Sequence, residues 1–150
     1  MKAEQRIGSA GEEQAALALR RLGIEMVEEI ATPVIVSRAS GKPVIVAWKE
    51  PVSGDHRGIL PGGRSVLVET KTIHDRNLRW SDLREHQPGR LDRHADLGGL
   101  SLLVWVHSSG IYIMVWPVPG FGPGRSIEPR RAERLCTEIK ANYNYPYPNG

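Results

Sequence analysis

The stretch from Ser65 to Thr72 constrains the fold of this chain more than any other part of the sequence. Its residues alternate between apolar and polar types and are rich in β-branched side chains, a pattern typical of a β-strand with one buried face. A Pro-Gly-Gly run at 61–63 precedes this stretch and marks a chain reversal. We therefore expect a hairpin with one arm at 56–60 and the other at 64–72.

Charged residues gather at one end of this expected hairpin. Side chains two residues apart on a strand share one face, so Glu69 and Lys71 point the same way and Thr70 points the other way. Asp55 stands at the start of the first arm, and it therefore lies opposite the far end of the second arm. The sequence predicts that two carboxylates and one ammonium group converge on a small patch of the sheet.

This predicted patch has the chemistry of a divalent-metal site. Mg²⁺ and Mn²⁺ prefer hard oxygen ligands, usually one or two carboxylates completed by waters and a substrate phosphate. Asp55 and Glu69 fit this preference, and the main-chain carbonyl of Thr70 could add a further oxygen. A metal ion in such a site lowers the pKa of bound water and grips a phosphodiester. Lys71 can then orient the attacking hydroxide or neutralise the charge that develops on the phosphorane.

Each of these residues also has a purely structural explanation. An acid and a lysine two residues apart on a strand commonly form a solvated face, and Asp55 after Gly54 can simply be a turn former. The combination of an acid after a turn, an acid-x-Lys strand and an upstream helix headed by an acid favours a functional site.

The upstream helix is predicted over 9–23. Ser9 is a good N-cap with Glu12 at the N3 position of a capping box, and Gly23 is a C-terminal stop. The apolar stripe of this helix consists of Ala15, Ala16, Leu19 and Leu22. Glu12 heads the stripe and is the preferred third acid of the site. The capping box alone also explains Glu12, and Glu13 is the second candidate.

The remaining pattern predicts an α/β fold with a central mixed β-sheet flanked by helices. The run from Leu100 to Val106 is almost continuously apolar, as in a strand that is covered on both faces. Residues 73–80 and 117–125 are predicted loops. Further strands are expected at 24–30, 33–38, 43–48, 100–107 and 111–116, and further helices at 86–97 and 128–141.

Composition narrows the class of protein. A chain of 150 residues with 40% hydrophobic content can build one domain, expected at 1–141, with a flexible tail at 142–150. The sequence has neither an apolar run long enough to span a membrane nor the apolar core of a signal peptide. Cys136 is the single cysteine, which excludes an intramolecular disulfide and favours the reducing cytoplasm. The net charge of +3 is compatible with nucleic-acid binding.

The order and spacing of these residues resemble the PD-(D/E)xK nuclease superfamily. Gly54-Asp55 matches the first acid of that pattern, and Glu69-Thr70-Lys71 matches its acid-x-Lys strand. Three further stretches resemble Holliday-junction resolvases of the RecU and Hjc type: the helix opening at 8–12, the Thr-Pro strand at 32–36, and the His-Gln helix around Glu85-His86-Gln87. The similarity runs in order over about residues 6–117.

The resemblance implies a restriction-endonuclease-like fold and a Mg²⁺-dependent DNA endonuclease in which Mn²⁺ substitutes for Mg²⁺. The residues that it implies for the active site are the metal-site acids Glu12, Asp55 and Glu69, the base-like cation Lys71 and the supporting Gln87. The implied substrate is a four-way DNA junction cut by a homodimer, because a dimer with two-fold symmetry supplies two active sites for two matched nicks. Recognition would depend on branch shape and phosphate positions.

Two alternatives stay open at this point. One is another nuclease on the same fold, such as a nickase, a restriction-type enzyme or a repair nuclease. The other is a non-catalytic DNA-binding module on a nuclease scaffold.

Several basic residues flank the predicted acids and are candidates for DNA contacts, since phosphate contacts supply most of the affinity for DNA. His86 is equally well explained as a packed histidine, and Gln87 could simply cap the helix that Pro88 starts. His56 is expected on the opposite face from Asp55 and not as a metal ligand. The candidates for phosphate contacts are Arg64, Arg76, Arg79, Arg84 and His86; Trp80, Trp105 and Trp116 are expected in the core or a dimer contact and not stacked on bases.

Overall fold

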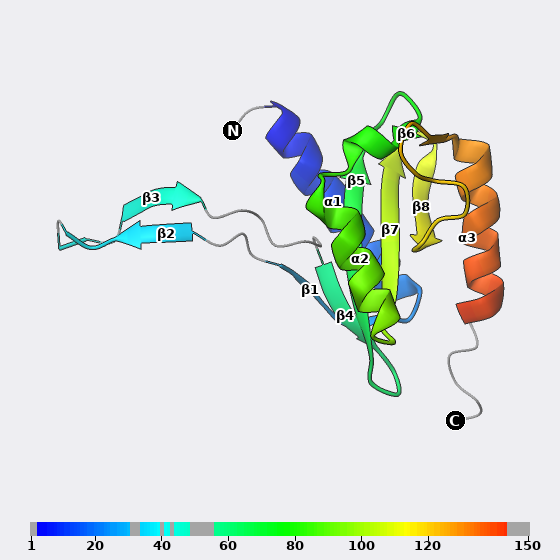
Figure 1. Ribbon diagram of the computed structural model, residues 1–150, viewed down its shortest axis with the longest axis horizontal. Helices are drawn as coiled ribbons and strands as arrows, with labels where there is room; N and C mark the ends of the chain where they lie inside the picture. Colours follow the sequence, from blue (N-terminus) through cyan, green and yellow to red (C-terminus); the bar gives the residue numbers. More distant parts are fainter. Residues whose placement is uncertain (1–2, 31–33, 40, 43, 49–55, 144–150) are drawn as a thin grey trace.

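The computed structural model describes residues 3–30, 34–39, 41–42, 44–48 and 56–143. Asp55, the Thr-Pro pair at 32–33 and the tail from 144 onward lie outside these ranges, so the expectations for them stay predictions. The described chain forms a mixed α/β structure in which helices flank a central five-stranded sheet (Figure 1). This arrangement confirms the predicted fold class.

The elements follow the predicted order closely. The helices are α1 (Ala3–Arg21), α2 (His86–Asp96) and α3 (Pro129–Tyr143), with a short 3-10 helix η1 (Trp80–Asp82). The strands are β1 (Glu25–Glu29), β2 (Val34–Ser37), β3 (Val44–Trp48), β4 (His56–Leu60), β5 (Arg64–Thr72), β6 (Leu78–Arg79), β7 (Leu100–His107), β8 (Gly110–Val115) and β9 (Ser126–Ile127).

The central sheet has the strand order β1-β4-β5-β7-β8. β4 and β5 pair antiparallel and form the predicted hairpin, in which Leu60 faces Arg64 and His56 faces Val68. β5 and β7 pair in parallel, and α2 lies in the connection between them. β2 and β3 form a separate two-stranded hairpin that extends away from the sheet in Figure 1.

Two hydrophobic cores cover the two faces of the sheet. On one face, Ala15 and Leu19 of α1 pack with Val66 and Val68 of β5. On the other face, a second core includes Leu91 of α2, Ala132 of α3, Leu103 and Trp105 of β7, and Trp116. β7 contributes to both cores and is buried at every position except His107, which confirms the prediction of a doubly covered strand.

The first helix begins earlier than its capping pattern predicts. Ser9 lies inside α1, which starts at Ala3, so the predicted capping box with Glu12 is wrong. The segment Ala3-Glu-Gln-Arg6 consists of strong helix formers, and these extend the helix past Ser9. Gly23 does end the helix as predicted: it has a φ of 98°, and the amide of Ile24 donates to the carbonyl of Leu19 as in a Schellman motif.

A glycine lets α1 approach the sheet. A side-chain carbon at Gly11 would collide with the hydroxyl of Thr72 at the end of β5. The missing Cβ therefore places the middle of α1 directly against the part of β5 that follows Glu69 and Lys71.

The loop predicted at 73–80 is more ordered than expected. Leu78 and Arg79 form β6, which pairs antiparallel with β9, and η1 follows at once. Trp105 and Trp116 are buried in the core, as predicted. No helix in the described ranges has the length and apolar character that crossing a membrane requires.

Candidate active site

The predicted acid-x-Lys pair lies on the face of β5 that packs against α2. Glu69 is fully buried, with 1% of its side chain exposed, and the Lys71 ammonium Nζ lies 3.5 Å from Glu69 Oε1. Leu67 and Ile73, which share this face by strand alternation, pack into the core on the α2 side. The prediction that Glu69 and Lys71 point the same way is therefore confirmed.

Gln87 joins this pair from the first turn of α2. Its side-chain amide Nε2 donates a 2.6 Å hydrogen bond to Glu69 Oε1, and its Oε1 accepts a 2.8 Å bond from the backbone amide of Arg84. The second bond orients the side chain so that its NH₂ group faces the carboxylate. Gln87 thus both supports the segment that leads into α2 and contacts the predicted acid, and its role in an active site stays a prediction.

The three side chains form a buried acid held between a cation and an amide donor. Burying a carboxylate is costly unless hydrogen bonds and an opposite charge compensate for the lost hydration. Lys71 and Gln87 supply both, and this is a specific arrangement rather than a solvated pair, because only 16% of the Lys71 side chain is exposed. The structure therefore argues against the exposed-face explanation of Glu69 and Lys71.

The donor chemistry of this site fits a hard divalent cation only with help from further ligands. Glu69 contributes one buried carboxylate, and Thr70 lies between it and Lys71 on the strand. No group of three or more His, Cys, Asp or Glu side chains suited to a metal ion occurs within the described part of the chain. An ion bound beside Glu69 would need oxygen ligands such as the predicted Asp55, which lies outside that part.

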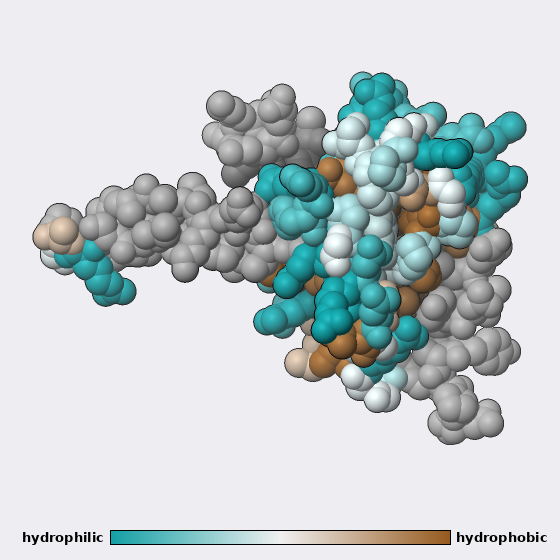
Figure 2. Space-filling model, viewed as in Figure 1, coloured by the Kyte–Doolittle hydropathy of each residue, from teal (hydrophilic) through white to brown (hydrophobic). Residues whose placement is uncertain are grey.

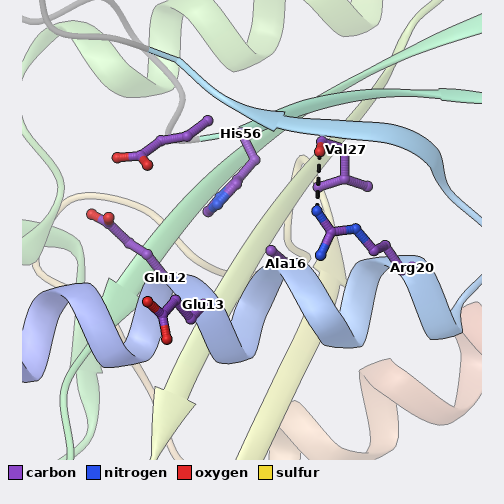
Figure 3. Close-up of a pocket in the computed structure, with 7 residues that line it drawn as sticks. Glu12, Glu13, Ala16, Arg20, Val27 and His56 are labelled. Carbon is purple, nitrogen blue, oxygen red and sulfur yellow. Dashed lines mark hydrogen bonds between the residues drawn. The ribbon is translucent and has the colours of Figure 1, made fainter.

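Glu12 lies on α1, on the other face of the sheet from Glu69. It lines a hollow of about 300 Å³ together with Glu13, Ala16, Arg20, Val27, Glu29 and His56 (Figure 3). Figure 3 shows the Glu12 side chain extending from the helix toward the strands, whereas Glu13 lies on its outer side. Glu12 is half-buried and Glu13 is exposed, which favours Glu12 as the acid that faces the hollow. Its role as a metal ligand stays a prediction.

His56 faces the same hollow. It is buried, and it pairs with Val68, whose side chain packs into the core beside α1. His56 therefore points to the face opposite Glu69, as the alternation of the strand predicts.

The predicted phosphate contacts fall in two different places. Arg64 lies at the start of β5, about 16 Å along the strand from Glu69, and its guanidinium donates to the carbonyls of Gly98 and Gly99 at 3.1 and 3.3 Å. The other four candidates lie near the opposite end of β5, where α2 begins: Arg76, Arg79, Arg84 and His86. His86 is half-buried, and its Nε2 has no hydrogen-bond partner within the described residues.

Arg76 is committed to an ion pair. Its guanidinium forms two bonds with the Asp82 carboxylate, at 2.8 and 2.7 Å. The hydrogen bonds from Arg76 hold the pKa of Asp82 below its usual value, and the same bonds raise the pKa of Arg76. This pair positions the segment from 76 to 82 and leaves Arg79 as the exposed arginine on it.

Two features of the structure were not foreseen from the sequence. Arg125 lies beside Arg79 because β9 pairs with β6, and the Gly/Pro-rich sequence before β9 did not indicate this pairing.

His94 is the second such feature and bridges two serines. Its Nε2 lies 3.0 Å from Ser65 Oγ and its Nδ1 lies 2.9 Å from Ser101 Oγ. Burial, with a smaller effect of the Arg64 charge, lowers the pKa of His94.

Comparison with known proteins rests on structure alone. No protein-family model and no curated protein sequence matches this chain. Its structure is similar to that of Hjc, a Holliday junction resolvase from the archaeal hyperthermophile Archaeoglobus fulgidus, with a TM-score of 0.57 and 12% sequence identity. The match covers 88% of this chain and 98% of that chain. The chain therefore has a distant resolvase-like fold, in which a mixed five-stranded sheet is flanked by helices.

Proposed function

We propose that this protein is a Mg²⁺-dependent DNA endonuclease that resolves four-way DNA junctions as a homodimer. The observation that carries the proposal is the buried Glu69 carboxylate, held by Gln87 at 2.6 Å and by Lys71 at 3.5 Å, within a sheet that has the resolvase-like fold. The sequence pattern that resembles the PD-(D/E)xK superfamily agrees with it, since that pattern uses the same acid and lysine.

The metal ion would be held by Glu69, Asp55 and the carbonyl of Thr70. Glu12 is the further acid that the resemblance implies, but α1 packs on the opposite face of the sheet, so the proposal does not depend on it. When bound, Mg²⁺ supplies a Lewis acid that polarises the scissile phosphate and lowers the pKa of a water molecule. Mn²⁺ has similar ligand preferences and would substitute for Mg²⁺.

The side chains around Glu69 have separate tasks in this proposal. Gln87 fixes the orientation of the carboxylate, because its own Oε1 is held by the Arg84 amide. Lys71 places a positive charge next to the carboxylate, where it orients the attacking water and offsets negative charge on the phosphorane. At about 4 Å and an intermediate dielectric, one such charge interacts by roughly 4 kcal/mol before desolvation costs.

The substrate in this proposal is branched DNA. A dimer with two-fold symmetry would place two equivalent sites on the two strands of a junction that are to be cut. Arginines near the start of α2, such as Arg79 and Arg84, are exposed and available for phosphate contacts.

The direct test is cleavage of a synthetic four-way junction with Mg²⁺, mapped on all four strands. The expected result is a pair of symmetric nicks, with linear duplex and flap substrates cut much more slowly. Equal rates on linear duplex would overturn the junction selectivity and favour another nuclease of this fold. Lys71→Met is the matched variant, because it keeps an unbranched side chain only one atom shorter and removes the charge.

The Lys71→Met variant is expected to bind the junction and to lose cleavage by about a hundredfold or more. If the wild-type protein binds junctions and cuts no DNA with either Mg²⁺ or Mn²⁺, the non-catalytic module is the correct alternative.

A further inference from the structure

A groove of about 590 Å³ lies beside the β6–β9 pair, at the end of the sheet to which β7 points in Figure 1. One wall is formed by residues 76–81, and the other by residues 123–126. Hydrophilic residues gather over this end of the molecule in Figure 2. The groove lies outside the Glu69 site.

The two walls are joined by backbone hydrogen bonds. Arg79 pairs with Ser126 across the ladder, and the amide of Trp80 donates a 2.9 Å bond to the carbonyl of Arg125. The amide of Arg125 in turn bonds the carbonyl of Gly122 at 2.9 Å, which closes the Gly/Pro-rich turn. The groove is thus a built part of the fold, and it brings together arginines that lie far apart in the sequence.

The groove carries positive charge that is not neutralised by ion pairs. Arg76 is paired with Asp82, but Arg79 and Arg125 are exposed, and neither forms a salt bridge within the described ranges. Asp82 also accepts a 2.7 Å bond from the backbone amide of Arg79, which steadies this wall. Both arginines line the groove, and guanidinium groups without an ion-pair partner favour an anion such as a phosphate.

An aromatic ring lines the same groove. Trp80 is half-buried, and it stacks on Trp116 with ring centroids 5.8 Å apart and an interplanar angle of 24°. Phe121 meets it edge-on, with a centroid distance of 5.2 Å. These contacts hold the indole in place, and a fixed aromatic surface is what an unstacked nucleobase binds best.

We propose that this groove binds a nucleotide of an unpaired DNA strand, with the phosphate on Arg79 and Arg125 and the base against Trp80. The proposal rests on the proposed function in taking DNA as the ligand. An unpaired strand is required because a base within a duplex is stacked on both sides and cannot offer its face to a side chain. Trp80 would therefore serve both as a core contact and as a base platform, and the second role departs from the expectation from the sequence that it does not stack on bases.

The groove also has a direct connection to the candidate active site. Its wall ends in η1, and Arg84, two residues after η1, donates its amide to the same Gln87 that bonds Glu69. A strand held in the groove would be led toward the acid and lysine of β5. A base pair at the centre of the junction would have to open to supply an unpaired nucleotide, so the groove would mark this opened position relative to the cut.

The test is binding of the full chain to a labelled oligothymidylate of about 12 nucleotides, in EDTA so that cleavage plays no part. An abasic oligonucleotide of the same length is the matched ligand. The wild-type protein is expected to bind the thymidylate about fivefold or more tightly than the abasic strand, because stacking on an aromatic ring contributes in this range. Quenching of tryptophan fluorescence by the thymidylate alone is the accompanying signal.

Variants separate the phosphate and base contributions. Arg79→Ala and Arg125→Ala are each expected to weaken binding several-fold and to reduce the slope of log K against log salt by about 0.7. Arg134→Ala removes an exposed arginine from α3 with the same change of charge, and it is expected to have a smaller effect on both quantities. Trp80→Phe is expected to reduce the difference in affinity between the thymidylate and the abasic strand. If this variant does not fold, the two arginine variants still test whether the groove binds the strand.

Equal affinities for the thymidylate and the abasic strand would contradict stacking of a base on Trp80. Unchanged binding by both arginine variants would contradict phosphate binding in the groove. Junction cleavage measured in parallel keeps the two proposals apart. If the wild-type protein cuts junctions and the groove variants bind the oligonucleotide normally, only the proposed binding in the groove is refuted. If the wild-type protein cuts no junction and the groove variants lose the oligonucleotide, only the proposed endonuclease activity is refuted.

Discussion

Gln87 on α2 donates a 2.6 Å hydrogen bond to the carboxylate of Glu69 on β5. The two residues lie 18 positions apart in the sequence and are joined because β5 and α2 pack on the same face of the sheet. This contact ties the position of a buried acid to the start of a helix. It therefore links the stability of the fold to the geometry of the candidate active site.

Replacing Gln87 with alanine is expected to lower stability and activity together. The change removes one hydrogen-bond donor from the buried Glu69 carboxylate, which costs about 1–3 kcal/mol of the free energy of unfolding. Loss of a partner that orients a metal ligand typically costs about 10–100-fold in metal affinity or activity. Urea unfolding and junction cleavage measure the two effects. Gln14→Ala, on the exposed side of α1, is the control and is expected to change neither stability nor cleavage. Equal stability and equal cleavage of the two variants would show that the bond between Gln87 and Glu69 contributes to neither.

Glu69→Gln tests whether the buried acid binds metal. Mn²⁺ is expected to raise the melting temperature of the wild-type protein, since a ligand that binds only the folded state stabilises it. The amide of the variant is nearly isosteric with the carboxylate but lacks its charge, so the rise should disappear. Thermal unfolding at increasing Mn²⁺ measures this, with Glu128→Gln, an exposed residue just before α3, as the control. A rise of equal size in the Glu69 variant would place the metal elsewhere.

Gly11→Ala is expected to destabilise the protein, although this change usually stabilises a helix interior by about 1 kcal/mol. The added methyl group would collide with Thr72, and such overpacking typically costs about 1–3 kcal/mol. Chemical denaturation measures the change in the free energy of unfolding.

The double variant with Thr72→Ala provides the control for Gly11. Removing the Thr72 hydroxyl and methyl makes room for the new side chain, so Gly11→Ala should be less harmful, or even favourable, in that background. Additive effects of the two changes would contradict the close approach of α1 to β5.

His94 is expected to make stability depend on pH. Ser101 donates to the carbonyl of Leu91 at 2.8 Å, so its oxygen accepts from His94 Nδ1–H, and the other ring nitrogen accepts from Ser65. This arrangement uses the neutral ring, which agrees with a pKa lowered by burial.

The direction of the pH effect follows from that lowered pKa. The unfolded chain takes up a proton on His94 near its ordinary pKa of 6.5, before the folded protein does. The contribution of His94 to stability is therefore complete above that pH and is lost as the pH falls toward the lower folded-state pKa. Urea unfolding between pH 8 and pH 5 measures it. His94→Asn should flatten the dependence of stability on pH, and His74→Asn, at an exposed site, should not. An unchanged pH dependence in His94→Asn would contradict the assignment of the effect to His94.

Local patterns predicted the longer elements of this fold, because periodicity and turn residues act over a few neighbouring positions. The hairpin of β4 and β5, the doubly covered β7 and the helix α2 all lie where their sequences indicated them. The capping box at Ser9 failed for a local reason as well, because the helix formers before it outweighed one cap.

The shared face of Glu69 and Lys71 was determined by the sequence itself, because alternation along a strand is a property of the backbone. The partner of Glu69 was decided only by the tertiary structure, since Gln87 reaches it through the packing of α2 on the sheet. The same holds for Arg125 beside Arg79, which depends on the pairing of two strands of two residues each, too short to leave a pattern. Periodicity specifies which way a side chain points, and only packing between distant segments determines what it meets.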